Sequence, residues 1–127
     1  MDNELSQQVI GCAFEVSNTL GAGFLENVYE KALCVELDKK GLAFDCQKPV
    51  NVMYKDVLVG DYITDIIVED SLLLELKAVS VMPVVYQAQL MNYLKATGLR
   101  YGLLLNFGTP KLGIKRMVWN HNETNKK

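Results

Sequence analysis

The chain has 127 residues, and 50% of them are apolar, which is enough to build the core of one ordinary domain. Its formal net charge of −2 argues against binding nucleic acid through a generally basic surface. No apolar stretch approaches the roughly 20 residues needed to cross a bilayer. We therefore expect no membrane association and predict a cytoplasmic protein.

Two helices are predicted at the start of the chain. Apolar residues from Leu5 to Leu20 recur at helical spacing and stop before Gly21. A second apolar series runs from Leu25 to Leu37 and is followed by two lysines and a glycine, which are typical of a helix C-terminus.

Three β-rich runs follow. Apolar and polar residues alternate from Val50 to Tyr54, and Lys55 and Asp56 read as a turn. The next two runs, 57–68 and 72–79, are separated by the polar residues 69–71. We expect an antiparallel meander in which residues 69–71 form a three-residue hairpin loop.

A third helix is predicted over about residues 83–96, closed by Gly98. The apolar run 101–107 is typical of a strand buried on both faces, and residues 114–119 could add another strand. A helix between strands permits a crossover connection, so we predict an α/β domain with a mixed central sheet flanked by helices.

The domain is expected to span residues 1–119, followed by a disordered polar tail at 120–127. The single histidine, His121, lies in that tail, which nearly excludes a histidine-dependent catalytic triad. Cys12, Cys34 and Cys46 lack the paired close spacing of a zinc knuckle, so we expect buried, reduced thiols.

The charges are unevenly distributed along the chain. Residues 1–94 hold 6 Lys and Arg against 14 Asp and Glu, a net of −8, whereas residues 95–127 hold 7 against 1, a net of +6. Lys111, Lys115 and Arg116 at the basic end are therefore candidate phosphate contacts. The alternative is that the two ends neutralise each other in the fold.

Two carboxylates and a lysine could form a metal site. Strand periodicity places Glu75 and Lys77 on one face, with leucines on the core side. If residues 69–71 form the hairpin loop, Asp65 lies opposite Glu75 with Cβ atoms roughly 4.5–5.5 Å apart. Such carboxylates repel unless a proton or a cation lies between them, and their oxygens suit Mg²⁺ or Mn²⁺. Lys77 could then activate a water or stabilise charge at phosphorus; the alternative is a surface ion pair with either acid.

The predicted helices carry further candidates. Glu26 could add a carboxylate if its helix crosses the sheet at the site; the alternative is a first-turn glutamate favoured by the helix dipole. Gln89 and Tyr93 are four residues apart and share a helix face, from which they could reach a phosphate or a base. The alternative for this pair is an ordinary helix surface.

These residues carry a family resemblance. The segment Gly23-Phe-Leu-Glu26-Asn-Val-Tyr29 resembles the signature of the GxxExxY family, which belongs to the PD-(D/E)xK nuclease-like superfamily. Further motifs match that family in order over roughly residues 5–118: Asp65, Glu75-Leu-Lys77, Gln89-Leu-Met-Asn-Tyr93-Leu and Gly102-Leu-Leu-Leu-Asn106-Phe-Gly108. Two positions depart from the family pattern, since Ile63 stands where arginine is frequent and Tyr86 where histidine is common.

The resemblance implies a restriction-endonuclease-like αβββαβ core. In that family Asp65, Glu75 and the backbone carbonyl of Leu76 would hold the divalent cation, and Glu26 would complete the site. Lys77 would be the catalytic lysine. Gln89 and Tyr93 would be similar to the Gln-x-x-x-Tyr motif that positions substrate and water.

The leading hypothesis is metal-dependent hydrolysis of DNA or RNA by in-line attack of a water, with DNA expected over RNA. The second hypothesis is a non-catalytic nucleic-acid-binding or protein-assembly module on a nuclease fold, because the domain is small and acidic overall. Such a module could depend on a partner subunit. A third is a homodimer in which each site acts on one strand.

Overall fold

The structure is a computed structural model that describes residues 3–119. In chain order its elements are α1 (Asn3–Leu20), α2 (Glu26–Lys39), β1 (Phe44–Cys46), β2 (Pro49–Tyr54), β3 (Val57–Ile63), β4 (Ile66–Val68), β5 (Leu72–Lys77), α3 (Val85–Thr97), β6 (Tyr101–Asn106) and β7 (Gly113–Val118). The predicted tail at 120–127 lies outside the described residues. Within residues 3–119, no helix is long and apolar enough to span a membrane.

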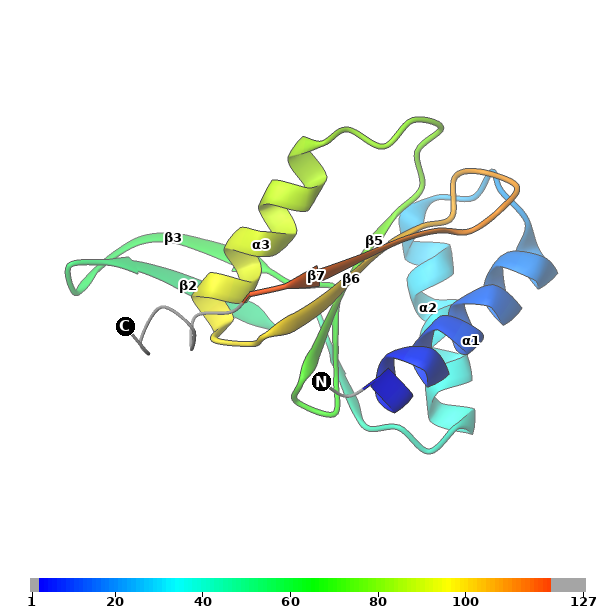
Figure 1. Cartoon of the computed structure of the whole chain (residues 1–127), viewed down its shortest axis with the longest axis horizontal. Helices are drawn as coiled ribbons and strands as arrows, with labels where there is room; N and C mark the ends of the chain where they lie inside the picture. The colour runs from blue at the N-terminus through cyan, green and yellow to red at the C-terminus, as the bar shows by residue number, and fades with distance from the viewer. Residues whose placement is uncertain (1–2, 120–127) are drawn as a thin grey trace.

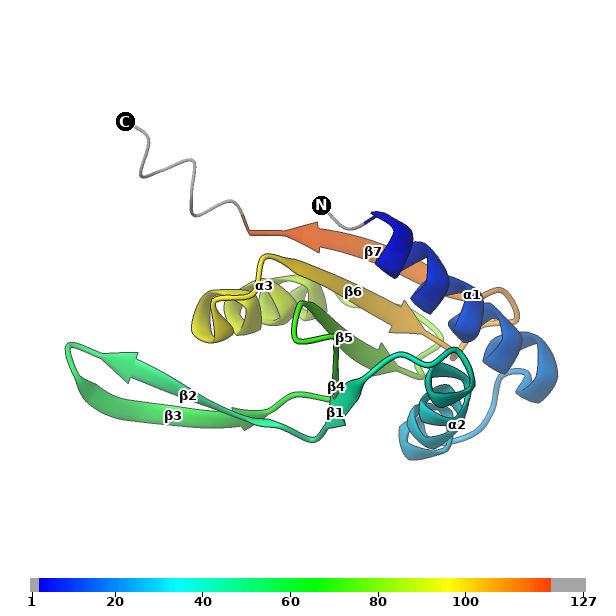
Figure 2. The same cartoon turned by 90° about the horizontal axis from the view of Figure 1, so that it is seen from below.

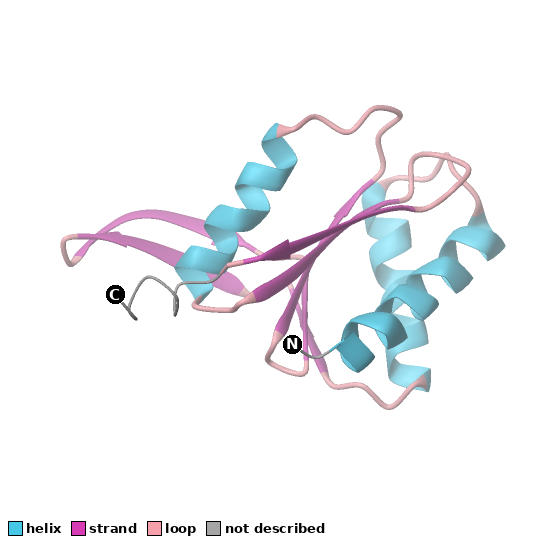
Figure 3. Ribbon diagram, in the orientation of Figure 1, coloured by secondary structure: helices cyan, strands magenta, loops and turns pink. Residues whose placement is uncertain are grey.

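A five-stranded mixed sheet forms the centre of the fold, with the strand order β1-β4-β5-β6-β7 (Figure 1). Only β5 and β6 are parallel within this sheet, and α3 makes the crossover between them. The mixed sheet with helices on both sides confirms the predicted α/β, restriction-endonuclease-like fold class (Figure 3).

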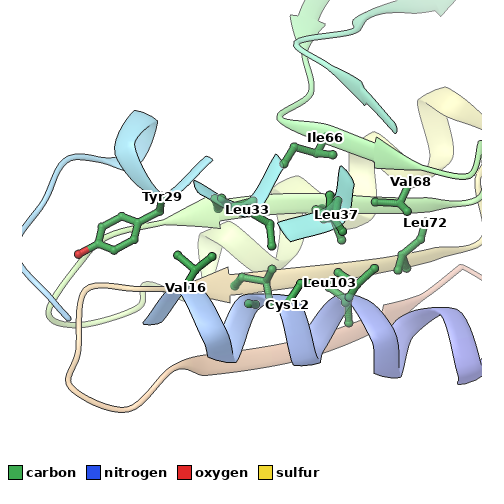
Figure 4. Close-up of a cluster of buried hydrophobic side chains, with 14 of the residues drawn as sticks. Cys12, Val16, Tyr29, Leu33, Leu37, Ile66, Val68, Leu72 and Leu103 are labelled. Carbon is green, nitrogen blue, oxygen red and sulfur yellow. The ribbon is translucent and has the colours of Figure 1, made fainter. Parts of the chain in front are cut away.

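The two faces of the sheet are covered by different helices. Helices α1 and α2 pack on one face and α3 on the other (Figure 2). Figure 4 shows side chains of α1 and α2, among them Cys12 and Leu33, packed against Ile66, Leu72 and Leu103 of the strands. On the other face, Leu73 and Leu104 meet Leu90 and Leu94 of α3. The leucine runs in β5 and β6 are therefore buried on both sides, as a central strand requires.

Tyr29, the tyrosine of the segment that resembles the GxxExxY signature, has a structural role. Its ring is fully buried and stacks on Phe107 with 4.8 Å between ring centroids. Its hydroxyl donates a hydrogen bond to the carbonyl of Gly21 at 2.5 Å and accepts one from the Phe24 N–H at 3.2 Å. Tyr29 therefore fixes the loop that joins α1 to α2.

The predicted three-strand meander is wrong in one respect. Strands β2 and β3 form a separate two-stranded hairpin, and the predicted run 57–68 is divided into β3 and β4. The break occurs where the segment before β2 and the segment after β3 both bend. Gln47 has a φ of 58°, and its N–H donates to the carbonyl of Asp65 at 2.9 Å. Thr64 donates to the carbonyl of Lys48 beside it. The β2–β3 hairpin consequently leaves the sheet and extends past α3 (Figures 1 and 2).

Both predicted turns within these strands are confirmed. Lys55 and Asp56 have positive φ values at the tip of the β2–β3 hairpin. Residues 69–71 form a three-residue loop, since Val68 pairs with Leu72 across it.

The cysteines differ from the prediction. Cys12 is buried as expected, but Cys34 is half-buried and Cys46 is exposed. Cys46 ends the three-residue edge strand β1, which leaves its side chain open to solvent. The Sγ atoms of Cys34 and Cys46 lie 3.0 Å apart, and both thiols are free.

Candidate active site

Asp65 and Glu75 lie side by side where β4 and β5 meet. Ile66 pairs with Leu74, so the next step of the register brings Asp65 next to Glu75. The carboxylate of Asp65 accepts a hydrogen bond from the N–H of Leu76 at 2.8 Å through its Oδ2 atom. Leu74 and Leu76 belong to the core beneath α1 and α2, so Glu75 points to the face that α3 covers.

Glu75 is an unusual carboxylate. Its side chain is only 7% exposed, and its Oε2 atom is the one buried side-chain oxygen or nitrogen within residues 3–119 that has no hydrogen-bond partner. Burial, and then the charge of Asp65, raise the pKa of Glu75 to about 8. Burial also raises the pKa of Asp65, although the Leu76 N–H and the Lys77 charge oppose the rise.

The metal-free pair is thus stabilised by a proton. Burial raises the pKa of both carboxyl groups, and the charge of Asp65 raises that of Glu75 further, so the pair favours the binding of a proton. A divalent cation could replace this proton and bind the oxygen that lacks a partner, because both groups are hard oxygen donors. The residues present therefore fit a divalent cation.

The backbone carbonyl of Leu76 faces the same place. In a strand, the N–H and C=O of one residue point to the same edge, and the N–H of Leu76 points to Asp65. The carbonyl of Lys77 points the opposite way and accepts from the Phe107 N–H at 2.8 Å. The alternation leaves the Leu76 carbonyl on the Asp65 side.

Lys77 is held by an aromatic ring. Its Nζ atom lies 4.2 Å from the ring centroid of Tyr86, the position at which the family pattern has histidine. In the part of the chain that the structure describes, no carboxylate lies within 4.0 Å of Lys77. Its charge nevertheless lowers the pKa of both Asp65 and Glu75. The alternative of a surface ion pair therefore does not describe this lysine.

One face of α3 extends the acidic site. Gln89 and Tyr93 follow Tyr86 by three and seven residues, so all three side chains share a helix face. Burial, and then the charge of Glu75, raise the pKa of the Tyr93 hydroxyl, as expected for a side chain on the helix face towards the acidic pair. Its ring also packs against Tyr62 of β3, with 5.4 Å between centroids.

Glu26 is exposed at the start of α2 and does not join the acidic pair. Within residues 3–119, no three His, Cys, Asp or Glu side chains come together in a way that could hold a metal ion. One turn further along α2, both carboxylate oxygens of Glu30 accept from the Gln47 Nε2 at 2.8 and 3.1 Å. Burial raises the pKa of Glu30, as do the charges of Asp65 and Glu26. The charge of Asp65 therefore acts on Glu30, a residue that no sequence motif singled out.

The three predicted cationic contacts do not form one surface. Lys115 pairs with Leu104 and Arg116 with Leu103, so the two basic side chains point to opposite faces of the sheet. Arg116 donates a hydrogen bond to the Ser6 Oγ on α1 at 2.7 Å, on the face away from Glu75. Lys111 lies exposed in the loop between β6 and β7. Of the three, Lys115 alone points to the face that α3 covers.

The sequence did not predict the hydrogen bonds by which Asn106 holds the backbone that follows Lys77. The side chain of Asn106 accepts from the N–H groups of Val79 and Gly108 and donates to the carbonyl of Val79, each at 3.0 Å. A Cβ on Gly108 would lie 2.2 Å from the Val79 nitrogen, so only glycine permits this approach. The motif Asn106-Phe-Gly108 was visible in the sequence, but its partner was not.

A nuclease-like fold is defined by these features together: a mixed sheet, two acids at adjoining strands and a lysine two residues after the second acid. A family model of the PD-(D/E)XK nuclease superfamily matches residues 3–117, and the chain belongs to this superfamily. Membership supports a nuclease-like function in general and nucleic-acid binding, and nucleases of this kind typically use divalent metal ions. The search of curated proteins and that of solved structures returned no match.

Proposed function

We propose that the chain is a metal-dependent nuclease, similar to the GxxExxY family, that hydrolyses phosphodiester bonds of DNA or RNA. The observation that carries this proposal is the buried Glu75 carboxylate, whose Oε2 atom has no hydrogen-bond partner and which lies beside Asp65. Burying a carboxyl group without a full set of hydrogen-bond partners costs folding free energy that an apolar side chain would not cost, and such acids cluster at functional sites. The single domain that we propose covers residues 1–119.

Asp65, Glu75 and the backbone carbonyl of Leu76 would hold the cation. These oxygen donors suit Mg²⁺ or Mn²⁺. When bound, the cation supplies Lewis-acid stabilisation of phosphoryl oxygens and lowers the pKa of a water. Glu26 and Glu30 would add negative charge at the α2 side of the site.

The remaining residues would bind and orient the substrate. The ammonium of Lys77, restrained by Tyr86, would donate hydrogen bonds to the phosphate and stabilise the charge that develops there. Gln89 and Tyr93 lie on the α3 face that extends the site, where they would orient the nucleotide. Lys115 would contact a neighbouring phosphate.

A cleavage assay tests the proposal. Single- and double-stranded DNA and RNA are incubated with Mg²⁺ or Mn²⁺ and the parent protein, Glu75→Gln, Lys77→Ala, or Lys39→Ala, which removes an exposed lysine at the end of α2. We expect cleavage by the parent and Lys39→Ala, and a loss of about 100-fold or more in the two site variants. Equal backgrounds in all four proteins would refute the enzyme and favour a binding module.

Calorimetric titration of Mn²⁺ gives an independent measure of the cation site. We expect Asp65→Asn to weaken Mn²⁺ binding, because it removes one charged ligand. If the affinity were unchanged, the assigned ligand set would be wrong.

A further inference from the structure

A groove adjoins the acidic site between the β2–β3 hairpin and α3. Its volume is about 580 Å³, which falls in the range of ligand-binding clefts. Its walls are formed by Asn51, Val52, Met53 and Tyr62 of the hairpin and by Gln89, Asn92, Tyr93, Lys95 and Ala96 of α3. Gln89 and Tyr93 belong both to this groove and to the helix face that extends the site.

The groove has the chemistry of a planar aromatic ligand with polar edges. Tyr62 is 48% exposed, so a large part of its ring is open to a ligand. It meets Tyr93 with 52° between ring planes, so the two rings form an angled aromatic wall. Asn51, Gln89 and Asn92 each offer an amide donor and an amide acceptor, the groups that read the edges of nucleobases.

The charge of the lining favours a single strand over a duplex as the occupant. Lys95 is the only cation among its lining residues, which is too little charge for a surface that tracks two phosphate backbones. Bases inside a duplex are stacked on each other and cannot stack on a side chain, whereas unpaired bases can.

We propose that this groove binds an unpaired nucleobase of a single-stranded nucleic acid, next to the proposed cleavage site at Asp65, Glu75 and Lys77. Tyr62 is the main stacking residue, and the amide groups contact the base edge. This inference rests on the proposed nuclease function for the position of the phosphodiester, but the groove binds its base whether or not cleavage follows.

Binding is measured by fluorescence anisotropy in EDTA, so that no cleavage occurs. The probes are labelled 12-nucleotide single strands of DNA and of RNA with one sequence, the DNA duplex of that sequence, and an abasic DNA strand with the same number of phosphates. The proteins are the parent, Tyr62→Ala, Tyr62→Phe and Tyr54→Ala. Tyr54 is a matched control, because it is an exposed tyrosine on the same hairpin that does not line the groove.

We expect Tyr62→Ala to weaken binding of the base-containing single strands roughly 5- to 150-fold, the loss typical of one stacking aromatic. Tyr62→Phe and Tyr54→Ala should bind within about twofold of the parent, since both leave an aromatic ring at position 62. The abasic strand and the duplex should bind weakly and respond little to Tyr62→Ala. The DNA and RNA arms show which sugar the groove accepts.

Three results would overturn the inference: no binding of single strands by the parent, equal binding of the abasic strand, or equal affinity of Tyr62→Ala and the parent. The outcome is separable from that of the cleavage assay. A protein that binds single strands through Tyr62 but cleaves nothing would contradict the proposed function alone. A protein that cleaves, but that binds single strands equally well with and without the Tyr62 ring, would contradict the groove alone.

Discussion

Substituting glutamine for Glu75 should make the metal-free protein more stable at alkaline pH. Burial and the Asp65 charge raise the pKa of Glu75 from 4.5 to about 8, so folding favours the protonated acid. Its stabilising contribution is fully present below pH 4.5 and is lost as the pH rises towards 8. A pKa difference of this size corresponds to a loss on the order of 5 kcal/mol in the free energy of unfolding.

Glu75→Gln keeps the shape and the hydrogen-bonding capacity of the protonated acid but does not ionise. Urea unfolding in EDTA should therefore give similar free energies for parent and variant near pH 5, and a higher free energy for the variant at pH 8.5. Glu15→Gln, which removes an exposed acid of α1, serves as the control and should follow the parent at every pH.

The reasoning fails if the unfolding free energies of the parent and Glu75→Gln run parallel from pH 5 to pH 8.5. Mn²⁺ should reverse the order at pH 8.5 by stabilising the parent and leaving Glu75→Gln nearly unchanged, since only the parent retains both carboxylates. A gain of equal size in the two proteins would place the cation elsewhere.

Gly108→Ala should destabilise the fold by about 1–3 kcal/mol or more, because its Cβ would lie 2.2 Å from the backbone nitrogen of Val79. Gly11→Ala is its counterpart, since a Cβ there meets nothing within 4 Å, and should stabilise α1 by up to about 1 kcal/mol. If both variants unfolded at lower urea concentrations than the parent, or both at higher ones, the space described around these two glycines would be wrong. Oxidised glutathione should join Cys34 to Cys46, whose sulfurs are 3.0 Å apart, and release two molecules of reduced glutathione. Titration should then find one free thiol per chain, and three after oxidation would contradict the contact.

The parts of the fold that were predictable depend on local signals. The polar residues 69–71 between two apolar runs set the β4–β5 register, and from that register the Asp65–Glu75 pairing follows. Gly98 ends α3 with a φ of 78°, the conformation that glycine adopts most readily. The position of α3 between two buried strands was sufficient to predict the crossover.

What could not be predicted depends on contacts between distant segments. The bend that separates β3 from β4 requires Gln47 and Lys48 to meet Thr64 and Asp65. Pro49 marks the start of a strand after Lys48, but no proline or glycine lies next to Thr64 and Asp65. The contacts of Lys77 with the Tyr86 ring and of Asn106 with Val79 also join segments that are distant in the sequence, so local patterns did not predict them. Tyr62 carried no signal, because an aromatic residue in a strand is ordinary on composition alone.

The β2–β3 hairpin stands apart from the hydrophobic core in its burial. Val50 is the one buried side chain in these two strands, and their remaining residues are exposed or half-buried. Substitutions at such exposed positions usually change stability by no more than about 0.5 kcal/mol. The hairpin can therefore diverge in sequence among relatives at little thermodynamic cost, whereas the leucines of β5 and β6 cannot. With the binding proposed for the groove, substitutions in this hairpin would change ligand preference and leave the hydrophobic core intact.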